Sequence, residues 1–384
     1  MNILLVAQDF PPASGGVQTY SLELAGGLAR LGHQVRVLAP AQAGDRAVDE
    51  VAGFEVHRVR TRPELMRLAA VAPLMRLCRQ QRPDVIIATT WQVAPAALLC
   101  RRSGLADRVT VAAHGRELLL QAKAPWQWAG AVESTHRRNT LNAADAILAV
   151  SHFTAGLVRS IGVDRPPVHV VPNGVDVRRF SPGAAGTFRH DHNVPPDTCL
   201  VLTVCRLVGR KGVDTLVRTM GRLRDLGHND VHLVVIGSGP EEGRLRELTA
   251  DLNCDSSVTF AGRIPWDALP DAYRSSDVFA MPAREERPDV EGFGLVFLEA
   301  SACGLPVIGA RTGGIPDAVD EPSSGFLVEA DDVDAIARHI LWLKHNPDES
   351  RAMGRRGAER VRDSCTWDHV AATVMFHLAS PTAT

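Results

Sequence analysis

Two carboxylates flank a glycine-rich turn in the segment Glu291-Gly-Phe-Gly-Leu-Val-Phe-Leu-Glu299. Its glycines permit a tight turn, and the apolar residues that follow favour a helix beginning near Gly294. The first N–H groups of such a helix are unpaired and attract an anion. Glu291 before the helix and Glu299 inside it would lie on the order of 10 Å apart. The pattern suits a sugar nucleotide. Two solvated carboxylates beside an amphipathic helix are the alternative for this segment taken alone.

A basic loop supplies positive charge in the same half of the chain. The segment Arg206-Leu-Val-Gly-Arg-Lys211-Gly212 follows an aliphatic run at 200–204 and precedes a helical pattern. Cations at a helix N-terminus oppose the helix dipole, so a bound phosphate explains them better than solvation does. We therefore expect the arginines and the lysine of this loop to bind a phosphate. A solvated basic loop is the alternative.

Other candidate binding residues also follow short aliphatic runs. Paired glycines or a histidine at such places fit phosphate or sugar contacts, although ordinary turns and a structural histidine are the alternatives. These residues are Gly15 and Gly16 after the run 2–7, His114 after 108–113, Gly237 and Gly239 after 231–236, and Arg263 and Ile264 after 257–260.

Length and composition bound the class of protein. The 384 residues fit two domains, and a net charge of −2 provides no global field for nucleic acid. The seven cysteines are odd in number and form no CxxC pair, which favours reduced thiols in the cytoplasm over a zinc site or a disulfide framework. The amino terminus lacks a basic n-region, and the longest uncharged run, 85–100, is too short to span a bilayer.

Short aliphatic runs alternate with helical patterns along the whole chain, which indicates βαβ units in two parallel sheets. We expect strands at 2–7, 34–39, 54–59, 84–89, 108–113, 145–150 and 168–171, then at 200–204, 231–236, 257–260, 278–281, 306–309 and 325–328.

The predicted fold class is therefore α/β, with two Rossmann-like, doubly wound domains facing a central crevice, because such sheets bind ligands at the carboxyl ends of their strands. We assign residues 1–172 to an acceptor-side domain and 187–364 to a nucleotide-sugar domain. The Pro- and Gly-rich stretch between them is the expected linker, and 365–384 the expected tail helix packing back on the first domain.

Taken together, these motifs resemble the family-four retaining glycosyltransferases of GT-B architecture, and the resemblance covers essentially the whole chain. It is carried by Gly15-Gly16-Val17, His114-Gly115, Arg206 with Lys211, Gly237-Ser-Gly239, Gly262-Arg263 and Glu291 to Glu299. Within the family the chain is most similar to bacterial GDP-mannose-dependent phosphatidylinositol-mannoside mannosyltransferases, in Asp9-Phe-Pro-Pro, Met281-Pro-Ala-Arg and Asp289-Val-Glu-Gly.

The resemblance implies a catalytic role for four residues. Arg206 and Lys211 would hold the donor diphosphate and offset the charge that builds on it. Glu291 would accept hydrogen bonds from the transferred sugar, and His114 would orient the 6-hydroxyl of that sugar. The further donor-binding residues are Gly15 and Gly16 on the diphosphate, Gly237, Gly239, Arg263 and Ile264 along the nucleotide, Gly292, Phe293, Gly294 and Leu295 through their backbone, and Glu299 on the ribose. Asp9 would contact the acceptor.

The same resemblance implies transfer on one face of the sugar, in which the leaving diphosphate takes the acceptor proton and the enzyme positions the reactants. It requires no cofactor and no metal. The Asp332-Val-Asp334 triplet opens a helical pattern near 333–346, where acids complement the dipole, and we interpret it as a cap.

The implied partners are a nucleotide-sugar donor and a lipid-linked or glycolipid acceptor, with no nucleic acid. Segment 62–82 carries five arginines among leucines and methionines. It fits peripheral contact with an anionic membrane at the inner face of the plasma membrane. An ordinary helix covering the first sheet, broken at Pro73, is the favoured alternative. Residues 123–128 with His136 to Arg138 form a second candidate acceptor rim.

Other functions stay open at this point. A glycosyltransferase of the same family could use UDP-glucose or UDP-N-acetylglucosamine instead of GDP-mannose. A GT-B sugar-nucleotide epimerase or phosphorylase would share the architecture without transferring to a lipid. A nucleotide-sugar-binding module without catalysis is the third class.

Overall fold

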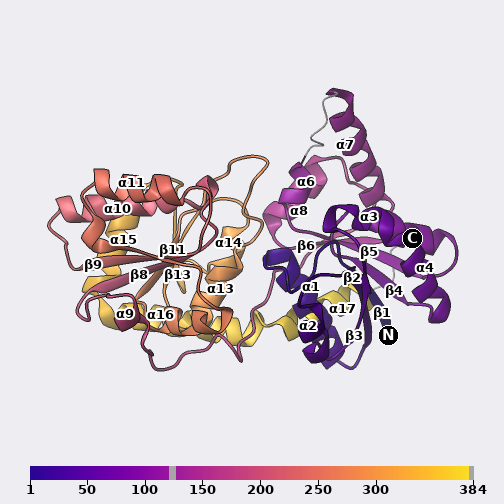
Figure 1. The fold of residues 1–384 in the computed structure, drawn as a ribbon, viewed down its shortest axis with the longest axis horizontal. Helices are drawn as coiled ribbons and strands as arrows, with labels where there is room; N and C mark the ends of the chain where they lie inside the picture. Colours follow the sequence, from indigo (N-terminus) through magenta and orange to yellow (C-terminus); the bar gives the residue numbers. More distant parts are fainter. Residues whose placement is uncertain (121–126, 380–384) are drawn as a thin grey trace. The chain divides into compact units, whose positions relative to one another are not determined.

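The computed structural model describes residues 1–120 and 127–379, which form two compact α/β units (Figure 1). The first unit comprises Met1–Asn173 together with the segment that starts at Trp367, and the second comprises Gly174–Thr366. Each unit is built on one fully parallel sheet with helices on both faces, which confirms the predicted fold class of two Rossmann-like domains.

The first sheet has seven strands in the order β3-β2-β1-β4-β5-β6-β7. Its centre is fully buried, with residues 3–6 at 0% exposure, as expected for a sheet covered on both faces. The strands are β1 (Asn2–Val6), β2 (Gln34–Pro40), β3 (Glu55–Val59), β4 (Val85–Ala88), β5 (Arg108–Ala113), β6 (Ala146–Ala149) and β7 (Val168–Val170).

Helices connect these strands, as parallel pairing requires. They are α1 (Gly16–Arg30), α2 (Asp45–Val51), α3 (Met66–Ala69), α4 (Val71–Gln80), α5 (Ala94–Arg102), α6 (Arg116–Leu119), α7 (Gln127–Asn142) and α8 (His152–Ser160).

The second sheet has six strands in the order β10-β9-β8-β11-β12-β13. They are β8 (Cys199–Val204), β9 (Val231–Ile236), β10 (Val258–Gly262), β11 (Val278–Met281), β12 (Val307–Ala310) and β13 (Gly325–Val328). The helices of this unit are α9 (Phe188–Asp191), α10 (Val213–Asp225), α11 (Glu242–Asp251), α12 (Leu269–Arg274), α13 (Leu295–Ala302), α14 (Ile315–Ala318), α15 (Val333–His345) and α16 (Pro347–Ser364).

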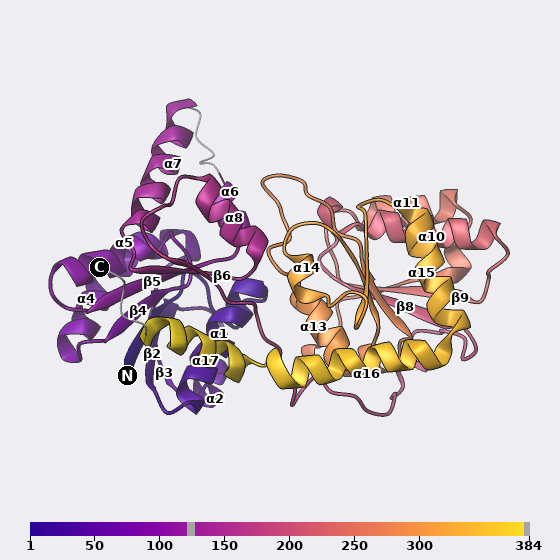
Figure 2. The same cartoon turned by 180° about the vertical axis from the view of Figure 1, so that it is seen from behind.

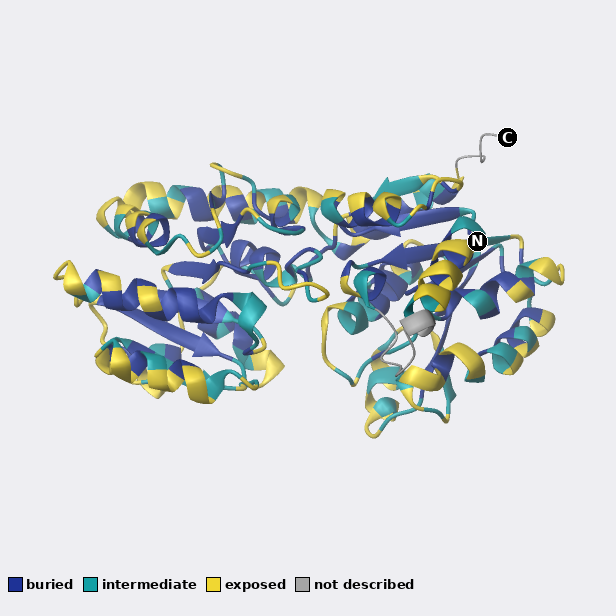
Figure 3. Ribbon diagram, turned by 90° about the horizontal axis from the view of Figure 1, so that it is seen from above, coloured by how far each residue is buried: buried dark blue, intermediate teal, exposed yellow. Residues whose placement is uncertain are grey.

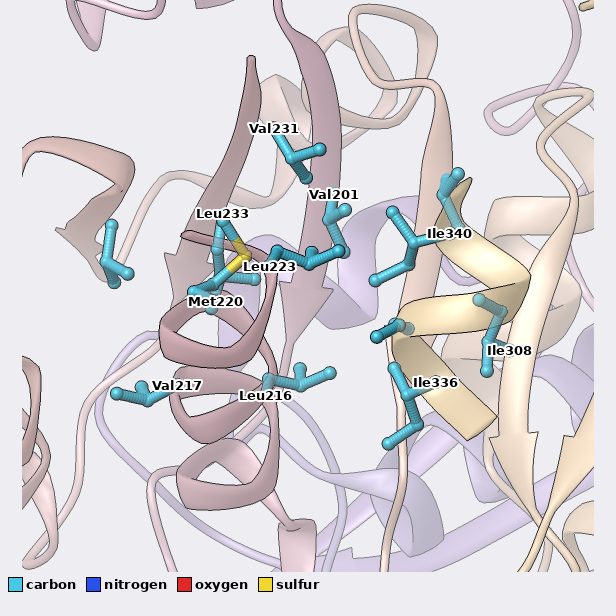
Figure 4. Close-up of a cluster of buried hydrophobic side chains, with 14 of the residues drawn as sticks. Val201, Leu216, Val217, Met220, Leu223, Val231, Leu233, Ile308, Ile336 and Ile340 are labelled. Atoms are coloured by element: carbon cyan, nitrogen blue, oxygen red, sulfur yellow. The ribbon is translucent and has the colours of Figure 1, made fainter. Parts of the chain in front are cut away.

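One hydrophobic core of the second unit lies between the sheet and helices α10 and α15. Figure 4 shows Leu216 and Met220 of α10 and Ile336 of α15 directed onto strand residues such as Val201 and Ile308. The inner strands are buried in both units, the edge strands β3, β7 and β10 are mostly only partly buried, and the helices expose their outer faces (Figure 3). This burial of apolar surface holds each sheet in place, and so fixes where the loops at its ends begin.

The tail helix α17 (Trp367–Ala379) completes the first unit by packing against α1, as Figure 2 shows. A Cβ at Gly27 of α1 would lie 2.7 Å from the carbonyl oxygen of Trp367, so only glycine permits this approach. Arg30 also pairs with Asp368 at 2.7 Å. The chain thus returns to its first unit after the second is finished.

The stretch expected as a linker is mostly part of the second unit, because the boundary falls between Asn173 and Gly174. Phe180 is 2% exposed and lies edge-on to Tyr273, with ring centroids 5.9 Å apart. The N–H of Gly186 donates to Asp271. An aromatic anchor inside a Pro- and Gly-rich stretch therefore fixes residues that their composition assigns to a free connection.

Each strand order reverses direction once, between β1 and β4 in the first sheet and between β8 and β11 in the second. In such sheets the loops leaving the carboxyl ends of the two central strands diverge and leave room for a ligand. Among the described residues, no helix combines the length and apolar character needed to cross a bilayer.

Candidate active site

One buried carboxylate joins the two loops at the switch point of the second sheet. Glu291, in the loop after β11, accepts hydrogen bonds from two cations of the loop after β8. The Nη1 atom of Arg210 and the Nζ atom of Lys211 lie 2.6 Å and 2.5 Å from the same oxygen, Oε2. The structure thus brings together Lys211 and Glu291, two of the four residues implied as catalytic.

These cations set the charge state of Glu291. Burial alone would raise the pKa of this carboxyl, but the charges and hydrogen bonds of Lys211 and Arg210 outweigh burial and lower it to about 2. The other oxygen, Oε1, has no hydrogen-bond partner in the described part of the chain. An ionised carboxylate with one free oxygen is suited to accept hydrogen bonds from sugar hydroxyls.

Close backbone packing sets the distance between the two loops. Gly212 has a φ of 69°, and a Cβ there would collide with the carbonyl oxygen of Pro282. The N–H of Arg284 donates to the carbonyl oxygen of Arg210 at 2.7 Å. The loop after β11 is therefore held against the turn that carries Lys211, which lets Glu291 reach it.

The helix after Glu291 begins where the glycine pattern predicts. Gly294 has a φ of 94° and caps α13, whose first residue is Leu295. The N–H groups of Leu295 and Val296 donate to no group among the residues that the structure describes. They are the unpaired donors expected of a helix N-terminus. Phe293 is buried, so it can offer a ligand only its backbone.

Glu299 lies inside α13 in a very different environment. It is 6% exposed, and its Oε2 accepts a hydrogen bond of 2.8 Å from the hydroxyl of Tyr273. Burial raises the pKa of Glu299 to about 7, and the hydrogen bond from Tyr273 only partly opposes this. A carboxyl group poised near neutrality would be stabilised in its charged form by ribose hydroxyls that donate to it.

The other donor-site candidates of this unit do not contact that cluster directly. Gly237 and Gly239 pack backbone to backbone against the carbonyl oxygens of Cys205 and Leu207, and a Cβ at either glycine would collide with them. Close packing of two loops therefore explains these glycines without a phosphate. Ile264 is partly exposed, while Arg206 and Arg263 are exposed and have no side-chain partner in the described part of the chain.

His114 lies at the carboxyl end of β5 in the first unit. Its Nε2 is 2.9 Å from the carbonyl oxygen of Thr89. Because a carbonyl only accepts, Nε2 carries the proton. Burial lowers the pKa of His114, although the charge of Glu117 and the bond to Thr89 act in the opposite direction. A neutral ring leaves Nδ1 free to accept from a hydroxyl, which fits the implied contact with a sugar.

Asp9 follows β1 and is held by two amides. Gln18 and Gln42 donate to its two carboxylate oxygens at 2.6 Å and 2.9 Å, and the N–H of Phe10 adds a third hydrogen bond at 2.9 Å. Gly15 and Gly16 are exposed, and Gly16 is the first residue of α1. The structure thus places the first unit's candidates at the carboxyl ends of β1 and β5.

The sequence signals some partners of these residues and gives no signal for others. Arg210 stands beside Lys211, and a second cation next to the first was a visible signal. Tyr273 lies far from Glu299 along the chain, so the pairing had no local signal, although the chain has only two tyrosines. The other one, Tyr20, packs edge-on against His114 with centroids 4.7 Å apart. The carboxylate of Glu117 accepts from the N–H of His114 at 2.6 Å.

The candidate membrane segment is helical, but its expected break at Pro73 is wrong. The chain breaks at Ala70, between α3 and α4, and Pro73 lies in the first turn of α4, where the missing N–H removes no helical hydrogen bond. Leu74 and Leu77 are buried, whereas Leu65 and Leu68 of this segment are 52% and 69% exposed. Of the second candidate rim, residues 123–126 and the side chain of Trp128 lie outside the described residues.

The acidic triplet behaves as a cap. The side chain of Asp332 accepts from the N–H of Ala335 at the start of α15, at 2.9 Å. Asp334 pairs with Arg222 at 2.8 Å. Both carboxylates are therefore engaged away from the Lys211–Glu291 cluster.

Comparison with known proteins decides the family. Residues 186–360 match the family model described as glycosyl transferases group 1, and residues 14–179 match that of glycosyltransferase family 4. The chain is 35% identical over 374 residues to a GDP-mannose-dependent alpha-(1-6)-phosphatidylinositol monomannoside mannosyltransferase of Mycolicibacterium smegmatis, with 95% of each chain covered. The chain belongs to the family 4 glycosyltransferases. A second relative, with the same description and from Mycobacterium tuberculosis, is 35% identical over 380 residues, which cover 97% of this chain and 96% of the relative.

Solved structures support the architecture of this glycosyltransferase. Sucrose-phosphate synthase from Thermosynechococcus elongatus superposes with a TM-score of 0.81 at 23% identity, covering 98% of each chain. HepE of Anabaena in complex with UDP gives 0.81 at 19% identity, covering 99% of this chain and all of that one. Family and fold together make the protein a nucleotide-sugar-dependent hexosyltransferase.

The basic loop after β8 generates a first prediction. Lys211→Ala or Arg206→Ala should lower sugar transfer about 100-fold or more, because on the expected assignment the donor diphosphate would lose a charge-assisted partner. Initial rates with radiolabelled donor would measure this, with circular dichroism to confirm folding. Arg218→Ala, an exposed arginine of α10, is the matched control. Transfer at wild-type rate by either site variant would contradict the assignment.

Glu299 generates a second prediction. A pKa of about 7 in the folded state, above an ordinary value of 4.5, means that the folded protein holds this proton more tightly than the unfolded chain. The protonated Glu299 side chain therefore contributes fully to the free energy of unfolding below about pH 4.5, and this contribution is lost as pH rises through 7. Between those limits the loss is on the order of 3 kcal/mol.

Glu299→Gln mimics the protonated side chain and is the matched comparison. The free energy of unfolding of wild type relative to this variant should fall as pH rises from 4.5 to 8, as measured by urea titration of the second unit. A difference that stays constant over this range would show that folding does not raise the pKa of Glu299.

Proposed function

We propose that this glycosyltransferase transfers mannose from GDP-mannose to a phosphatidylinositol-mannoside acceptor, with retention of the anomeric configuration. The observation that carries the proposal is the identity of 35% across 95% of the chain to relatives of that description. The Lys211–Glu291 cluster supports it, since it supplies cationic charge for a diphosphate beside a carboxylate for sugar hydroxyls.

The arrangement of carboxylates favours transfer on one face of the sugar. A retaining enzyme with a protein nucleophile needs two carboxyl groups about 5 Å apart around the reacting carbon. Here Glu291 is held by cations and Glu299 by Tyr273, and each serves better as a hydrogen-bond acceptor. The leaving diphosphate is then the base, and Arg206 and Lys211 offset the charge that develops on it.

We also propose that the enzyme works in the cytoplasm against the inner face of the membrane. All seven cysteines are free thiols, which fits a reducing compartment. Leu65 and Leu68 are exposed in the same segment as the exposed Arg62, Arg67 and Arg76, and a segment of this composition suits the headgroup region of anionic lipids.

A donor and acceptor panel tests the proposed reaction. Mannose should be transferred from GDP-mannose to phosphatidylinositol mannoside, and sugar should not be transferred from UDP-glucose or UDP-N-acetylglucosamine. Thermal shift with each nucleotide sugar gives an independent readout, because a ligand of the native state raises the melting temperature. A preference for UDP-sugars would support the alternative donor.

The same panel tests membrane contact. Leu68→Asp should lower transfer to acceptor embedded in anionic vesicles and leave transfer to a deacylated, water-soluble acceptor unchanged. An equal effect on both acceptors would place Leu68 in the fold or the catalytic centre instead of at the membrane.

We propose that catalysis needs no metal ion, since the expected diphosphate ligands Arg206 and Lys211 would supply the positive charge that a metal would bring. Activity in excess EDTA should therefore equal that of the untreated enzyme. A loss of activity that Mg²⁺ or Mn²⁺ specifically restores would overturn this.

A further inference from the structure

The carboxylate of Glu291 and the diphosphate of a nucleotide sugar compete for the same cation. Lys211 is the implied diphosphate ligand, yet here its Nζ is bound to Glu291 at 2.5 Å. The side chains are 11% and 14% exposed, so little water is available to either partner. Binding of a diphosphate to Lys211 must therefore be coupled to a change at Glu291.

Arg210 determines the free-energy penalty that Glu291 pays when it loses Lys211. A buried carboxylate that loses its only cation is strongly destabilised. Glu291 has two cations, and the Nη1 atom of Arg210 lies 2.6 Å from Oε2, so one cation would still be in place if Lys211 were withdrawn. The carboxylate can then remain charged without Lys211.

Arg210 is itself held by the loop that carries Glu291. Its carbonyl oxygen accepts from the N–H of Arg284 at 2.7 Å, and the guanidinium of Arg284 binds Asp214 and the hydroxyl of Thr215 in α10. The contact between Arg210 and Glu291 is therefore supported by hydrogen bonds of Arg284 that do not involve Lys211.

We propose that Glu291 is the counter-ion of Lys211 only while the donor site is empty, and that Arg210 is a positioning residue that keeps Glu291 ready for the donor sugar once the diphosphate has taken Lys211. This rests on the proposed function of the site. The exchange presents both carboxylate oxygens to sugar hydroxyls only after the diphosphate is seated. This exchange does not strengthen the binding of a diphosphate that carries no sugar, because no sugar hydroxyl is present to donate to the carboxylate.

Binding of GDP, which has the diphosphate without the sugar, separates the two roles. Glu291→Gln releases Lys211 in the free enzyme, so GDP should bind about tenfold tighter, the effect of one charge-assisted hydrogen bond, while transfer is lost. Isothermal titration measures the affinity. Removing any nearby negative charge could favour an anion, so Glu286→Gln is the matched control. A Cβ at Gly209 would lie 2.8 Å from the Glu286 carboxylate, so this charge sits over the same turn.

Arg210→Gln tests the positioning role. The ratio of GDP-mannose affinity to GDP affinity should fall about tenfold, together with kcat, and Arg210→Lys should restore part of both. In the Glu291→Gln background the same change should leave that ratio unaltered, because there is no carboxylate left to position. Arg218→Gln removes an equal charge from α10 and should change neither quantity.

Three results would overturn the proposal. These are GDP affinity in Glu291→Gln no higher than in wild type, an equal rise in Glu286→Gln, and an unchanged affinity ratio in Arg210→Gln. The assignment of GDP-mannose as donor can be wrong without overturning this proposal. If wild type binds UDP instead of GDP, the same variants measured with UDP and UDP-glucose still decide whether the exchange occurs.

Discussion

The site of the second unit depends on one oxygen atom, Oε2 of Glu291, that is shared by two cations. The bond can form only if the loops after β8 and β11 lie in contact, and these strands are neighbours at the reversal of the sheet order. Gly212 then allows the loops to touch through their backbones. The contact between the two loops thus requires the strand order first, then a glycine with left-handed backbone angles, and then the shared carboxylate.

Three titratable candidate residues, two carboxyl groups and one imidazole, are held in three different protonation states. Glu291 is ionised by its cations, Glu299 is buried without one, and His114 is neutral beside a carbonyl oxygen. Environment, and not residue type, separates the two carboxyl groups, as is usual where carboxyl groups serve different roles. Each of the two tyrosines packs against one of these residues, so aromatic burial helps to set two of the three environments.

Much of this arrangement could be predicted from the sequence because its signals are local. Aliphatic runs mark all thirteen strands of the two sheets, and the start of α13 follows from Gly294. Long-range partners had no such signal, since Tyr273 and Glu299 meet only through tertiary packing. Composition alone also predicted a linker where Phe180 packs against Tyr273. The glycine at 237 is likewise required by close loop packing, whether or not a phosphate binds there.

The position of α17 has a consequence for synthesis. The first unit leaves the ribosome first, but the helix that covers α1 is translated only after all of Gly174–Thr366. The surface around Gly27 therefore stays uncovered while the second unit emerges and folds. Domains usually fold as units in the order of their synthesis. Here the earlier domain is completed only after the later one has been translated, because α17 follows Gly174–Thr366 in the chain.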